Sequence, residues 1–190
     1  MTTVNAKTVD FIHMADGTAE EYALLAANEA ANPVAVADNA MGLLKGLVGH
    51  NHGNRIDRYQ HSLQTATRAH RDGADEEMVV IALLHDIGDM HAPNNHSAFA
   101  AAVLQPYISA DNHWLVLHHG VFQGYYYFHH YDRDRDAREQ FRGHAMFEKT
   151  ADFCERWDQT SFDPNYQTMV LEDFEPLVRR VLARPAESFV

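Results

Sequence analysis

The chain has 190 residues, of which 46% are hydrophobic and 11% aromatic, which is enough to form the core of one globular domain. Its net charge of −12, with 27 acidic against 15 basic residues, argues against nucleic acid as a partner, because phosphate backbones are bound by clustered Lys and Arg. One cysteine and no long apolar stretch exclude an internal disulfide and a membrane span, so a cytoplasmic protein is expected.

The first quarter of the chain predicts two helices. Thr18 and Glu21 form a capping-box pattern for a helix over 18–31, in which the hydroxyl and the carboxylate bind amides of the first turn. Pro33 breaks that helix and begins a second one, which the apolar residues extend over 33–47.

Two helices with different patterns follow. Apolar or small residues recur at helical spacing over 55–70, which places His61 in the middle of a helix. The segment 75–84 begins with acidic residues and continues as an apolar run, which predicts a buried helix. His85 and Asp86 lie on its final turn.

The second half of the chain also reads as helical. Further helices are predicted over 96–104, 114–119, 145–157 and 171–183. His96 opens the first, His119 lies in the second, and Asp158 ends the third. Because no strand pattern is persuasive, we expect an all-α fold in a single domain.

The pair His85-Asp86 is the first indication of chemistry. Burying an ionised carboxylate costs several kcal/mol unless the carboxylate is paired or coordinates a cation. A helix-terminal His-Asp that faces solvent is the simpler explanation of such a dipeptide alone. The chain has 14 histidines, however, and neutral imidazole is the commonest ligand of transition metals.

The order of His and Asp residues along the chain resembles that of the HD-domain superfamily. The local matches are 59–63, 83–88, 95–97, 118–120 and 156–158. This resemblance implies an HD-domain helical bundle over 1–190, with a metal-binding core at about 55–160 and helices 18–47 packed on it.

The resemblance also implies the metal ligands. The six ligands are His61, His85, Asp86, His96, His119 and Asp158. One ion takes His61, His85 and Asp158, the other takes His96 and His119, and Asp86 bridges them. Four imidazoles and two carboxylates suit iron or manganese better than magnesium, which prefers oxygen ligands.

Among two-metal HD proteins, the chain is most similar to the mixed-valence di-iron oxygenases that cleave carbon–phosphorus bonds of 1-hydroxyphosphonates. The resemblance implies two iron ions as Fe(II)/Fe(III), O2 as co-substrate and a small phosphonate as substrate. The expected substrate is (R)-1-hydroxy-2-(trimethylammonio)ethylphosphonate, which would give glycine betaine and phosphate. Oligomeric state cannot be inferred.

The chain departs from the relatives that act on a primary amine. Their Tyr-x-x-Glu segment is replaced by 51–54, their phosphonate-binding Lys by Gln123, and a His after the bridging Asp by Asp89. A quaternary ammonium donates no hydrogen bond and is held by aromatic faces, for which Tyr126 is a candidate. The expected substrate contacts are Asn54, Asp89, Gln123, Tyr126 and Arg156, with catalytic roles for Asp86, Asp89 and Gln123.

Two alternatives use the same residues. A two-metal HD phosphohydrolase would clamp a phosphate ester or nucleotide and generate hydroxide from bound water. A non-catalytic HD module that binds a partner would be expected to have lost ligands, and all six positions are filled here.

Overall fold

The computed structural model describes residues 7–30 and 33–185, and every regular element within those ranges is helical. This confirms the predicted all-α class. The helices are α1 Ala19–Ala30, α2 Pro33–Lys45, α3 Arg58–Arg71, α4 Glu76–Leu84, α5 His96–Leu104, α6 Ala110–Gln123, α7 Phe147–Phe153 and α8 Leu171–Leu182. Within the described ranges, no helix is both long enough and apolar enough to cross a membrane.

Short polar side chains set the starts of the helices that carry the site. The carboxylate of Asp57 accepts a hydrogen bond from the Gln60 amide at the start of α3, at 2.8 Å. Asp75 caps α4 in the same way through the Met78 amide, also at 2.8 Å. These caps bind amides that have no partner inside the helix, and they fix where each helix begins.

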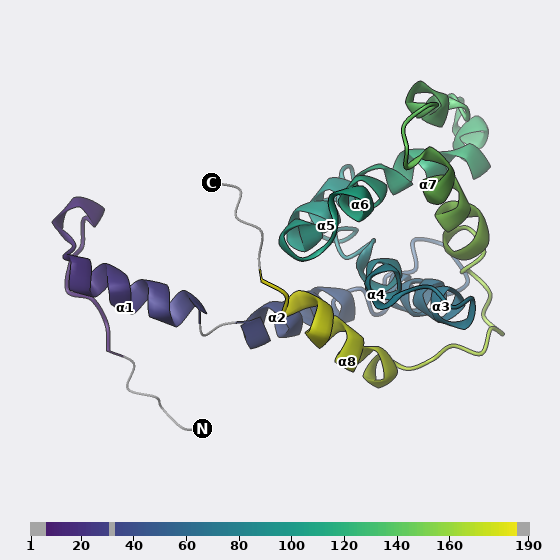
Figure 1. Ribbon diagram of the computed structural model, residues 1–190. Helices are drawn as coiled ribbons and strands as arrows, with labels where there is room; N and C mark the ends of the chain where they lie inside the picture. The colour runs from purple at the N-terminus through teal and green to yellow at the C-terminus, as the bar shows by residue number, and fades with distance from the viewer. Residues whose placement is uncertain (1–6, 31–32, 186–190) are drawn as a thin grey trace.

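Helix α4 lies at the centre of the bundle. Every residue from Met78 to Leu84 is buried, as the apolar run predicted. Figure 1 shows α3 and α4 side by side, with α8 on one side of the pair and α5, α6 and α7 on the other. Helices α6, α7 and α8 share one continuous core, to which they contribute the buried rings of Phe122, Phe153 and Phe174.

The two N-terminal helices differ in how they lie relative to the rest of the bundle. Helix α2 packs on α3 and α8, and its Met41 and Leu44 are buried in the core. Helix α1 lies apart from the bundle in Figure 1. Over residues 19–28 of this helix, the large apolar side chains are those of Tyr22, Leu24 and Leu25, which offer little area to bury. The capping box of Thr18 and Glu21 is formed as predicted.

The end of the helix expected over 145–157 has an unusual geometry. Helix α7 stops at Phe153 and continues as a π-helical turn, Cys154–Asp158, in which the Gln159 amide donates to the Cys154 carbonyl at 3.0 Å. A π-turn inserts one extra residue per turn and changes the direction of the side chains that follow. Asp158, the last residue of this turn, is buried.

Candidate metal centre

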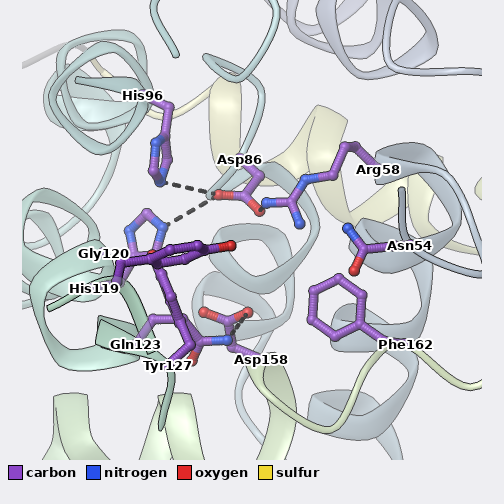
Figure 2. Close-up of a pocket in the computed structure, with 11 residues that line it drawn as sticks. Asn54, Arg58, Asp86, His96, His119, Gly120, Gln123, Tyr127, Asp158 and Phe162 are labelled. Atoms are coloured by element: carbon purple, nitrogen blue, oxygen red, sulfur yellow. Dashed lines mark hydrogen bonds and ion pairs between the residues drawn. The ribbon is translucent and has the colours of Figure 1, made fainter. Parts of the chain in front are cut away.

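Five elements bring the six predicted ligands together. His61 comes from α3, His85 and Asp86 from the turn after α4, and the others from α5, α6 and the π-turn. Five of the six are buried, and His96 has a side chain that is 25% exposed. The ring of His96 therefore lies on the solvent-accessible side of the cluster. Figure 2 shows this ring above Asp86.

The two carboxylate oxygens of Asp86 face different histidines. Its Oδ2 lies 3.3 Å from His61 Nε2 and 3.2 Å from His85 Nε2. Its Oδ1 lies 3.2 Å from His119 Nε2 and 3.5 Å from His96 Nε2. One carboxylate thus stands between two pairs of imidazole nitrogens, which is the arrangement expected of a bridging ligand.

Asp158 lies beside the first of these pairs, formed by His61 and His85. Its Oδ1 lies 3.2 Å from His61 Nε2 and 3.7 Å from His85 Nε2. The Nε2 atoms of these two rings are themselves 3.4 Å apart. Three nitrogen and oxygen donors around one small space are typical of a metal site.

The other ring nitrogen of each buried histidine is held by the main chain. Nδ1 of His85 donates to the Ala82 carbonyl at 2.9 Å, and Nδ1 of His119 donates to the Val116 carbonyl at 2.7 Å. His61 donates in the same way to the carbonyl of residue 161, at 3.0 Å. Because a carbonyl oxygen can only accept, each Nδ1 carries the proton and each Nε2 is directed at the cluster for binding.

The charges of the cluster fit a bound cation. Burial raises the pKa of Asp86, but His85 and Arg58 more than compensate and hold it well below its usual range. Burial likewise raises the pKa of Asp158, but His61 and His85 lower it by more, so the net shift is downward. Burial lowers the pKa of His85, yet Asp86 and Asp158 raise it to about 10. A metal ion between these groups would take the place of the His85 proton and face the two carboxylates.

Among the described residues, three groups of side chains have ligand atoms close enough to hold an ion. They are His61 with His85 and Asp86, His85 with His119 and Asp158, and Asp86 with His96 and His119. The first and third agree with the two-ion division implied by the HD resemblance, and the second crosses it. These buried His and Asp groups can hold a metal ion.

A cavity of about 350 Å³ opens beside the cluster (Figure 2). Its wall consists of Asn54, Arg58, Asp86, His96, His119, Gly120, Gln123, Tyr127, Tyr131, Asp158 and Phe162. Four of the six ligands line it, so a molecule in this space would touch bound metal directly. The amide of Gln123 donates to Asp158 Oδ1 at 3.2 Å and links the cavity wall to the cluster.

The predicted substrate contacts divide into two sets. Asn54 and Gln123 line the cavity. Asp89 accepts a hydrogen bond from Arg58 and lines a smaller neighbouring cavity. Tyr126 packs against the core, and Arg156 forms an exposed ion pair with Asp72 at 2.8 Å. Neither Tyr126 nor Arg156 lines the cavity.

Four side chains of the cavity wall were not among the predicted site residues, and Gly120 lines the wall as well. Tyr127 and Tyr131 lie in the aromatic segment 125–131, whose two 3-10 turns Gly124–Tyr126 and Phe128–Tyr131 change the helical spacing. Phe162 lies in the loop after the π-turn, and its ring stacks on His61 at 4.4 Å. Arg58 lies three residues before His61 in α3, and this spacing was the signal that could have found it.

Comparison with known proteins adds no family to this description. No protein-family model matches the chain, and no curated protein matches it either.

Proposed function

We propose that this protein is a di-iron oxygenase that uses O2 to cleave the carbon–phosphorus bond of a 1-hydroxyphosphonate. The substrate that fits best is (R)-1-hydroxy-2-(trimethylammonio)ethylphosphonate, which would give glycine betaine and phosphate. The observation that carries the proposal is Asp86, whose two oxygens face two separate pairs of imidazole nitrogens beside an accessible cavity.

The donor set supports iron as the metal. Four imidazole nitrogens and two carboxylates suit iron or manganese better than magnesium, and thiolates, which favour other metals, are absent from the cluster. When bound, two iron ions would supply the activation of O2 and the oxidation of the substrate carbon. His61, His85 and Asp158 would hold one ion, His96 and His119 the other, and Asp86 both.

The chain's own residues would orient the substrate. The side-chain oxygen of Gln123 is buried and has no hydrogen-bond partner among the described residues, while its nitrogen donates to Asp158. Gln123 lines the cavity beside these ligands, so its amide can form a hydrogen bond with the substrate's 1-hydroxyl and hold the hydroxyl beside the metal ligands.

Aromatic rings in the cavity wall fit the trimethylammonium group. This group donates no hydrogen bond, and each cation–π contact stabilises it by about 0.5–2 kcal/mol. Tyr127, Tyr131 and Phe162 present their rings on the wall of the same cavity. The cation therefore has aromatic partners within reach of the metal cluster, although Tyr126 is not one of them.

An oxygen-electrode assay tests the proposal. Iron-loaded protein should consume O2 and release phosphate from 1-hydroxyphosphonates, with the trimethylammonium compound preferred over the primary amine. A coupled Fe(II)/Fe(III) EPR signal that changes on adding substrate should accompany the activity. Absence of O2 consumption with all 1-hydroxyphosphonates at full iron content would refute the oxygenase.

A two-metal phosphohydrolase is the second candidate. The observation that favours it is the guanidinium of Arg58 on the wall beside Asp86, since a cation next to two metal sites also suits a phosphate ester. Anaerobic release of phosphate from simple phosphate esters, with a redox-inactive metal bound, would support hydrolysis in place of oxygenation.

A further inference from the structure

Among the described residues, one cationic side chain lines the cavity beside the metal cluster. Of the residues that form its wall, Arg58 is the only lysine or arginine. Its side chain is 16% exposed, and Gln123, which also lines the wall, carries no charge. For an anionic substrate, Arg58 is therefore the cationic side chain available on this wall.

Two carboxylates on one turn hold the guanidinium of Arg58. Its Nε donates to Asp89 Oδ2, and its Nη2 donates to Asp86 Oδ2. The Asp89 amide donates to the Asp86 carbonyl at 3.0 Å, so this turn after α4 presents both carboxylates to Arg58. Asp89 is not one of the ligand groups and can keep Arg58 in place while Asp86 binds metal.

The remaining terminal nitrogen of Arg58, Nη1, has no hydrogen-bond partner among the described residues. Figure 2 shows a guanidinium nitrogen directed at the open space between Asn54, Tyr127 and Phe162. The guanidinium carbon also lies 5.7 Å from the centre of the Phe162 ring, which limits its movement. A held guanidinium with free N–H groups facing a cavity is a ready binding group for a phosphonate or phosphate oxygen.

We infer that Arg58 binds the anionic group of the substrate, with the Asn54 amide beside it and Asp89 as the residue that positions it. The inference rests on the proposed function for the chemistry of the anion, a phosphonate next to the metal ions. It places the anion on the α3 side of the cavity and leaves the Tyr127 side for the organic cation.

Phosphate binding to the iron-loaded protein tests this assignment. Isothermal titration calorimetry with inorganic phosphate, under anaerobic conditions, should show about 10- to 100-fold weaker binding for Arg58→Gln than for the wild type. Iron content is measured on each sample, so that lost metal is not mistaken for a lost contact. Unchanged phosphate affinity in an Arg58→Gln protein with full iron content would overturn the inference.

Two other arginines provide matched controls. Arg156 lies two residues before the ligand Asp158 in sequence but is paired with Asp72 at the surface, so Arg156→Gln should bind phosphate as the wild type does. Arg133 lines a neighbouring hollow that shares Tyr127, and its guanidinium lies 3.9 Å from the Phe128 ring. Loss of phosphate binding in Arg133→Gln, with Arg58→Gln unaffected, would assign the anion to that hollow instead.

A crystal structure of the iron-loaded wild type with phosphate decides the matter if Arg58→Gln does not retain iron. Phosphate within hydrogen-bond distance of Arg58 Nη1 is expected, and phosphate bound away from Arg58 contradicts the inference. The test is also separable from the oxygenase assay. Arg58-dependent phosphate binding without O2 consumption would refute the oxygenase alone, whereas O2-dependent turnover with Arg58-independent phosphate binding would refute the anion site alone.

Discussion

Replacing Asp86 by Asn should remove both metal ions, because one carboxylate faces both pairs of imidazoles. Asn keeps the shape of the side chain but has no charge and only one acceptor oxygen. His96→Ala should remove one ion only, since His96 belongs to one of the three ligand groups. The two variants therefore differ in metal stoichiometry as well as in affinity.

The expected size of the effect follows from the linkage between binding and folding. An ion that binds only the folded protein adds about 2.7 kcal/mol when its free concentration is 100 times its Kd. For a chain of this length each kcal/mol raises Tm by about 2–4 °C. Two ions should thus raise Tm by about 11–22 °C in the wild type, one ion by about half of that in His96→Ala, and none in Asp86→Asn.

Two measurements check this prediction: metal content by mass spectrometry after desalting, and thermal unfolding with and without a chelator. The chelated samples show whether Asp86→Asn folds in the first place. Asp152→Asn is the matched control, because Asp152 is exposed and lies outside all three ligand groups. An Asp86→Asn protein that keeps one ion and half of the thermal shift would refute the bridging role of Asp86.

Three further predictions test other parts of the structure. Burial raises the pKa of the Cys154 thiol well above its usual value, so the thiol should stay protonated and resist alkylation at about pH 8 unless the protein is denatured; rapid labelling of native protein would contradict this. Tyr127→Ala should weaken binding of a trimethylammonium substrate by about 2- to 30-fold while Tyr126→Ala changes it less, as competition binding would show. Asp75→Ala removes the cap of α4 and should lower Tm by about 2–4 °C without loss of metal, measured by calorimetry and metal analysis.

Most of the helical architecture could be predicted from the sequence because its signals are local. The segment 75–84, acidic at its start and then apolar, predicted α4 to within one residue, and the structure shows Asp75 as its cap. Helix α1 has a correct capping signal as well, but its packing depends on how much apolar surface it offers, which its cap does not reveal. Local patterns thus predicted where helices form better than where they pack.

The metal cluster could be predicted further than the substrate cavity. The resemblance to HD-domain proteins implied the ligand positions, among them His61, His85 and Asp86, and the ligand atoms of these three lie close together in the structure. Tyr127 could not be distinguished from Tyr126, because the 3-10 turn Gly124–Tyr126 advances each residue by a larger angle than the α-helix before it. Phe162 lies in a loop without periodicity, and only the three-dimensional structure brings its ring onto His61.

The way the ligand rings are held has a consequence for how this site can change over evolution. His85 and His119 are oriented by carbonyls three residues earlier in their own chain segments, and His61 by another main-chain carbonyl. Every residue type supplies such a carbonyl, so no side-chain substitution at those positions removes the acceptor itself. The cavity wall can therefore vary, and with it the range of substrates, while the geometry of the metal-binding nitrogens is inherited unchanged.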